Sequence, residues 1–76
     1  MPLDPKPDWV THRQQVIGER IRTGRRTAGL SQVQLGDRIG RDHKTIHRYE
    51  TAQSVPTLID LLLLADVLGM SLGDFG

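Results

Sequence analysis

The sequence predicts an all-α protein, a compact bundle of five short helices in one domain. A chain of 76 residues can bury only one small core, so no second domain is expected. Phe, Trp and Tyr occur once each, and the leucines and isoleucines that dominate the apolar residues suit helices better than strands. Apolar residues also recur at helical spacing between residues typical of helix ends. Cysteine is absent, which excludes disulfides and thiolate metal sites.

The first helix is expected over His12–Thr27, at the start of a folded domain over residues 11–76. Residues 1–10 are expected to form a flexible arm, because their prolines remove backbone donors and restrict the preceding residues. Thr11, with Gln14 three residues later, has the pattern of a capping box. The inward face of this helix is expected to comprise Ile17, Ile21, Gly24 and Ala28.

A second helix of about two turns is expected after Gly29, a glycine suited to the left-handed end of the first helix. Ser31 and Gln34 repeat the capping-box pattern at its start. Gly40 should end it. The side chains that it is expected to bury are Val33, Leu35 and Ile39.

A third helix is expected over His43–Glu50, with Asp42 as its N-cap and with Ile46 and Tyr49 turned inward. Two short helices joined by a glycine-containing turn are typical of a helix-turn-helix that enters the major groove of DNA. Gly36 supports this interpretation, since a glycine inside a helix costs about 0.5–1 kcal/mol relative to alanine and allows another helix to approach closely.

The fourth helix is expected after the loop Thr51–Pro56, with Thr57 as its cap and Asp60 in its first turn. Its apolar face is expected to comprise Leu58, Leu61, Leu62, Ala65 and Leu68, and Gly69 should end it. A run of leucines cannot turn every member inward, so Leu63 or Leu64 should be partly exposed. Ser71 and Asp74 indicate a last short turn that brings three side chains onto the core, those of Met70, Leu72 and Phe75.

The charges are divided unevenly along the chain. Residues 12–50 hold nine basic and four acidic residues, a net charge of +5, whereas the rest of the chain holds one basic and five acidic residues, a net charge of −4. A basic segment of this kind is typical of a protein with one side that faces a polyanion.

The helix-turn-helix segment resembles the Cro and phage-repressor family, also called the XRE family. The resemblance rests on Leu30-Ser31-Gln32 through Gly40, on Thr45 through Glu50, on Val55 through Leu58 and on Leu61 through Gly69. It extends over about residues 14–75. It implies a five-helix fold of the lambda-repressor type and a sequence-specific transcriptional regulator of double-stranded DNA, most often a repressor and a homodimer.

The resemblance also implies roles for individual residues. The third helix would contact bases through His43, Lys44, Thr45 and Arg48, and lysine and arginine favour guanine O6 and N7. Phosphate contacts are expected from Gln32, Arg41, His47 and Gln53. The family commonly pairs an arginine late in the first helix with the glutamate that ends the third, here Arg25 and Glu50. Ala52 departs from the family, which often has glycine after the third helix.

Other function classes find less support in the sequence. His43 and His47 have the spacing of two metal-binding imidazoles but lack a third ligand nearby, so we expect no metal. The glycines lack the lysine and the strand of a phosphate loop, and no serine occupies a nucleophile elbow, so neither a cofactor nor an enzyme activity is expected. No stretch has the length of a membrane span or the pattern of a signal peptide, so a cytoplasmic protein is expected.

Two alternatives stay open from the sequence. The chain could be a DNA-binding antitoxin or an adapter that binds another protein through the proline-rich arm or through the C-terminal leucines. It could also be one domain of a longer protein.

Overall fold

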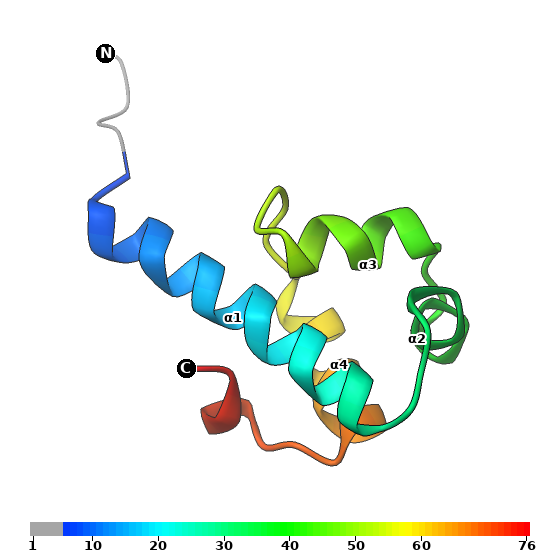
Figure 1. Ribbon diagram of the computed structural model, residues 1–76. Helices are drawn as coiled ribbons and strands as arrows, with labels where there is room; N and C mark the ends of the chain where they lie inside the picture. Colours follow the sequence, from blue (N-terminus) through cyan, green and yellow to red (C-terminus); the bar gives the residue numbers. More distant parts are fainter. Residues whose placement is uncertain (1–5) are drawn as a thin grey trace.

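The computed structural model describes residues 6–76 and contains four α-helices and a short 3-10 helix (Figure 1). Their bounds are α1 Asp8–Thr27, α2 Gln32–Ile39, α3 His43–Glu50, α4 Leu58–Leu68 and η1 Leu72–Phe75. The all-α class is confirmed, and no strand occurs among residues 6–76. The expected fifth helix is a single 3-10 turn, so the α-helices number four. No helix in this described range is long and apolar enough to cross a bilayer.

Helix α1 begins at Asp8, earlier than expected from the sequence. Its N-cap is Pro7, whose carbonyl accepts the backbone N–H groups of Val10 at 3.0 Å and Thr11 at 3.3 Å. Asp8 in the first turn interacts favourably with the positive end of the helix dipole. The expected cap at Thr11 is therefore wrong, and residues 8–10 belong to the helix, not to an arm. Residues 1–5 of the expected arm lie outside the described residues.

The bounds of α3 and the caps of α2 and α3 agree with the expectations. Ser31 Oγ accepts the Gln34 N–H at 3.0 Å while Gln34 Oε1 accepts the Ser31 N–H at 2.8 Å. Gly40 ends α2 with φ 73°. Asp42 Oδ1 accepts the Thr45 N–H at 2.8 Å, and this hydrogen bond holds the pKa of Asp42 below its usual value. Two short helices with defined ends thus follow from local capping chemistry.

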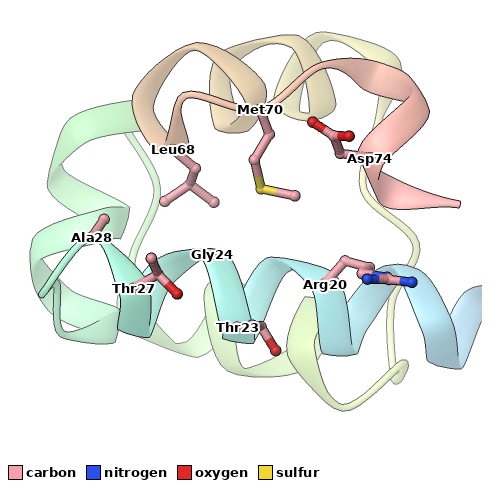
Figure 2. Close-up of a pocket in the computed structure, with 8 residues that line it drawn as sticks. All are labelled: Arg20, Thr23, Gly24, Thr27, Ala28, Leu68, Met70 and Asp74. Atoms are coloured by element: carbon pink, nitrogen blue, oxygen red, sulfur yellow. The ribbon is translucent and has the colours of Figure 1, made fainter.

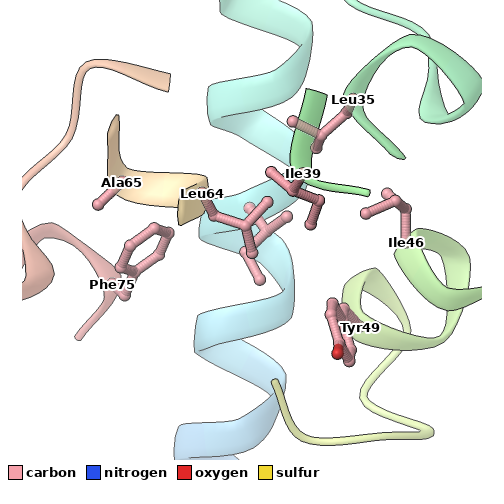
Figure 3. Packing of buried hydrophobic residues seen from close by; sticks show 8 residues of the cluster. Leu35, Ile39, Ile46, Tyr49, Leu64, Ala65 and Phe75 are labelled. Carbon is pink, nitrogen blue, oxygen red and sulfur yellow. The ribbon is translucent and has the colours of Figure 1, made fainter. Parts of the chain in front are cut away.

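The core lies where α1 crosses the other helices (Figure 3). Ile21 of α1, Leu35 of α2, Ile46 of α3 and Leu64 of α4 are all fully buried. Phe75 of η1 closes the core at 3% exposure. Each α-helix therefore contributes at least one buried aliphatic side chain, and the C-terminal turn covers the end of the core.

The inward face of α4 differs from the expected one. Leu58 and Leu62 are exposed at 65% and 49%, whereas Leu64 is buried and Leu63 is the exposed member of the pair. The side chains that face inward are Asp60, Leu61, Leu64, Ala65, Val67 and Leu68. A helix with four consecutive leucines carries no periodic signal, so its rotation is set by packing and by the buried Asp60. Three other side chains expected inward are also exposed, namely Ala28, Val33 and Leu72.

Two glycines allow helices to meet without a side chain between them. A Cβ at Gly36 would lie 2.4 Å from the carbonyl oxygen of Arg41, in the turn before α3. A Cβ at Gly18 would lie 2.6 Å from the carbonyl oxygen of Tyr49, at the other end of α3. The turn before α3 is therefore packed closely against α2, and the end of α3 is packed closely against α1. The close approach at Gly18 is not evident from the sequence.

Candidate nucleic-acid interface

The two faces of α3 are chemically different. Ile46 is fully buried and Tyr49 is 7% exposed, so these two side chains attach the helix to the core. On the other side, polar and basic residues are exposed to solvent, namely His43, Lys44, His47 and Arg48. The separation follows from the helical period that begins at the Asp42 cap.

These exposed side chains line a shallow polar depression together with residues from the two flanking segments. Its lining consists of Gln32 at the start of α2, the α3 residues His43, Lys44, His47 and Arg48, and Gln53 of the following loop. The fold thus brings together six of the eight residues expected to contact bases or phosphates. The other two, Thr45 and Arg41, are not part of this lining.

Thr45 and Gln32 each have contacts within the protein. The backbone N–H of Thr45 binds the Asp42 carboxylate, and the residue is partly buried. The side-chain amide of Gln32 donates to Glu50 Oε1 at 3.2 Å, which orients the start of α2 relative to the end of α3. A hydrogen-bonded Gln32 at the edge of the depression presents its amide in one defined orientation.

The expected ion pair between Arg25 and Glu50 is present in the structure. Arg25 Nε donates to Glu50 Oε2 at 2.6 Å, and Arg25 Nη2 donates to Glu50 Oε1 at 3.1 Å. Arg25 Nη1 also donates to the carbonyl oxygen of Leu30 at 2.9 Å. Glu50 is 7% exposed, so three donors from α1 and α2 compensate its buried charge and hold the end of α3.

Arg41 lies in the turn between α2 and α3, and its guanidinium is bound within the protein. Its Nε donates to Asp60 Oδ2 at 3.0 Å and its Nη2 donates to Asp60 Oδ1 at 3.3 Å. This hydrogen bond and the charge of Asp60 raise the pKa of Arg41 above its usual value. The ion pair with Asp60 is a contact that the sequence did not predict for Arg41, and the arginine side chain stays 46% exposed beside it.

Asp60 is the residue of this region whose role the sequence did not reveal. It was interpreted as a first-turn acidic residue of α4, but it is 1% exposed and accepts hydrogen bonds from Arg41 and from the Tyr49 hydroxyl at 2.6 Å. Burial and the hydrogen bond to Asp60 raise the pKa of Tyr49 to about 12. The available signal is a carboxylate between Ile59 and Leu61, in a stretch from Leu58 to Ala65 that is otherwise apolar.

The loop after α3 adopts a conformation that usually requires glycine. Ala52 has φ 61°, although it carries a Cβ. The backbone N–H groups of Gln53 and Ser54 donate to the carbonyl oxygen of Arg48 at 2.9 and 3.2 Å. These bonds hold Gln53 beside the end of α3, with alanine at the position where the family often has glycine.

A second hollow lies between α1 and the segment that links α4 to η1 (Figure 2). Arg20 and Asp74 lie at one end of it, and Leu68 and Met70 face the helix near Gly24. It shares no residue with the polar depression on α3. Among residues 6–76, no group of three or more His, Asp or Glu side chains is placed to hold a metal ion.

Comparison with known proteins gives three similarities. Residues 16–74 match the helix-turn-helix domain family. Over 58 residues the chain is 31% identical to the cryptic phage CTXphi transcriptional repressor RstR of Vibrio cholerae serotype O1 (strain ATCC 39315 / El Tor Inaba N16961), covering 76% of this chain and 52% of the repressor. The chain thus spans about half the length of that relative.

The fold is similar to the crystal structure of the restriction-modification controller protein C.AhdI from Aeromonas hydrophila. The TM-score is 0.80 at 27% sequence identity, and the match covers 87% of this chain and 96% of that chain. The likeness therefore includes nearly the whole of the solved protein.

Proposed function

The chain belongs to the helix-turn-helix domain family and is a DNA-binding protein of the Cro and phage-repressor type, and from this premise we propose that it represses transcription by binding operator DNA through α3. The observation that carries the proposal is the polar depression lined by residues of α2, α3 and the following loop. A two-turn helix with one buried apolar face and one exposed polar face fits the dimensions of a major groove.

Within this proposal, base contacts come from the exposed face of α3. Lys44 and Arg48 carry long cationic side chains suited to guanine O6 and N7, so each half-site should contain at least one G·C pair. His43 and Thr45 belong to the first turn of the helix and contact bases there. Phosphate contacts come from the edges of the depression, where Gln32, His47 and Gln53 lie.

We also propose that the protein binds DNA as a homodimer through the exposed apolar side of α4. This leucine surface comprises Leu58, Ile59, Leu62, Leu63 and Leu72, which are 39–68% exposed. Four of these side chains lie on α4 and Leu72 lies on η1, and exposed apolar side chains gathered in this way typically mark an interface. In a symmetric dimer the two copies of α3 should reach half-sites about one helical turn apart. Leu62→Lys should convert the dimer to a monomer in sedimentation experiments. Co-purification of a different protein would instead favour the antitoxin or adapter alternative.

Selection of binding sites from random duplexes tests the proposed function. The account predicts enrichment of a pseudo-palindrome with half-sites about one helical turn apart. Arg48→Ala should then reduce affinity for the enriched site by about 1–3 kcal/mol and relax one base preference. Arg38→Ala, which removes an exposed arginine outside the depression, is the matched control and should retain the preference. Absence of any enriched sequence for the wild-type protein would contradict the proposal.

A further inference from the structure

The carboxylate of Asp60 is almost completely buried, yet its helix carries the exposed leucine surface. Asp60 is 1% exposed, and Leu58, Ile59 and Leu62 on the same helix are 49–68% exposed. Its own backbone N–H donates to Thr57 Oγ1 at 3.1 Å, which fixes the first turn of α4 around it. The residue therefore lies between the leucine surface and the interior of the helix-turn-helix.

Asp60 binds residues at both ends of α3. Arg41 precedes the Asp42 cap of the helix and donates to both carboxylate oxygens of Asp60, with Nε at 3.0 Å from Oδ2. Tyr49 belongs to the last turn of α3, and its hydroxyl donates to Asp60 Oδ2 at 2.6 Å. One carboxylate on α4 thus connects to the beginning and to the end of the helix that faces the depression.

The bonds of Asp60 restrict both the position and the direction of α3 relative to α4. A buried carboxylate is stable only while charged or hydrogen-bonding donors surround it, so both donors must stay in place together. Arg41 meets the carboxylate with two nitrogens, which restricts the angle as well as the distance. Rotation or translation of α3 relative to α4 would lengthen or misalign these bonds, because a hydrogen bond weakens steeply with distance and angle.

We propose that Asp60 is a positioning residue for DNA recognition, which sets the orientation of α3 relative to α4 through its bonds to Arg41 and Tyr49. The inference rests on the proposed function, because the orientation matters for recognition only if α3 enters a groove. In a dimer formed through α4, the same bonds set the direction of α3 relative to the two-fold axis, and hence the fit to both half-sites.

Asp60→Asn tests the proposal, with Asp66→Asn as the matched control. Both changes remove one negative charge from α4, but Asp66 is exposed and Asp60 is bound. Affinity is measured for a duplex enriched by selection and for an unrelated duplex of equal length, with each variant shown by circular dichroism to be folded. Asp60→Asn should bind the enriched duplex about tenfold more weakly, and its affinity for the unrelated duplex should stay within about twofold of wild type. Asp66→Asn should change neither affinity. Equal losses on both duplexes, or none on either, would overturn the proposal.

Tyr49→Phe keeps the test decisive if Asp60→Asn does not fold. The substitution retains the buried ring and removes only the hydroxyl that binds Asp60. It should lower the affinity ratio between enriched and unrelated duplexes by about two- to fivefold, and an unchanged ratio would contradict the inference.

Hydrogen exchange without DNA separates the failure of this inference from the failure of the proposed function. Loss of the Asp60 bonds should accelerate exchange of the α3 amides of Ile46 and His47 while that of Ile21 in α1 is unchanged. Equal acceleration in both helices, or none, would overturn the role of Asp60 even if the wild-type protein binds DNA selectively. Equal affinity of the wild-type protein for both duplexes would instead refute the proposed function.

Discussion

Ala52 is the one described non-glycine residue with a left-handed backbone, and this conformation has a measurable cost. At φ 61° its Cβ is crowded by the backbone, which glycine avoids. Ala52→Gly should therefore raise the free energy of unfolding by about 0.5–1 kcal/mol. Ala28→Gly is the control, because Ala28 has φ −77° and glycine there should only add flexibility to the unfolded chain. Urea unfolding that shows Ala52→Gly to be less stable than wild type would contradict the strained conformation.

Tyr49 provides a residue-scale test of the Asp60 contact, because it is the only tyrosine in the chain. Burial and the Asp60 hydrogen bond raise its pKa from 10.0 to about 12, so ultraviolet titration of the folded protein should find the tyrosinate only near pH 12. Between pH 10 and 12 the unfolded state loses this proton first, so the free energy of unfolding should fall over that interval and be insensitive to this group below it. Asp60→Asn should lower the pKa of Tyr49, and a wild-type midpoint near pH 10 would refute the buried contact.

At the scale of elements, the turn between α2 and α3 depends on a glycine that no side chain can replace. A Cβ at Gly36 would lie 2.4 Å from the Arg41 carbonyl oxygen, a backbone atom that cannot rotate away. Gly36→Ala should destabilise the protein by about 1–3 kcal/mol, although alanine favours a helix intrinsically. Gly73→Ala is the control, since its nearest contact would be at an ordinary 3.7 Å. Equal thermal stability of Gly36→Ala and wild type would show that Gly36 of α2 does not contact the Arg41 carbonyl oxygen of the turn.

The elements most easily predicted from the sequence are those that begin and end by local chemistry. Ser31, Gly40 and Asp42 determine the short helices through hydrogen bonds within a few residues, so periodicity and caps were sufficient there. The start of α1 was missed because a proline carbonyl, in place of a side chain, accepts its first N–H groups. The rotation of α4 was missed because Leu61 and its leucine neighbours provide no contrast between faces.

Some features of the candidate site were likewise predictable from the sequence and others were not. The outward direction of Lys44 and Arg48 follows from the helical period, and the pairing of Arg25 with Glu50 came from the family resemblance. The Arg41 and Asp60 pair joins residues 19 apart in the sequence, and only the three-dimensional packing of α4 against the turn reveals it. This polar contact between elements therefore required the structure, unlike the pair of Arg25 with Glu50.

For the whole molecule, the uneven charge predicts salt-dependent DNA binding. The basic residues 12–50 carry a net charge of +5, which includes the cationic side chains of α3, and the remainder carries −4. If the bound protein neutralises about six phosphates, the logarithm of affinity should fall with the logarithm of salt concentration at a slope of about −5. Gel-shift titrations over a range of salt concentrations measure this slope. Tight binding that does not respond to salt would show that the basic segment of residues 12–50 does not face the phosphate backbone.

The central claim is that the exposed polar side of α3 is the surface that enters DNA. Titration of isotope-labelled protein with a selected duplex, followed by amide chemical shifts, tests it most directly. The account predicts the largest shift changes at Gln32, across His43 to Arg48 and at Gln53, with little change around the hollow between Arg20 and Asp74. Largest changes around that hollow, with α3 unaffected, would contradict the account.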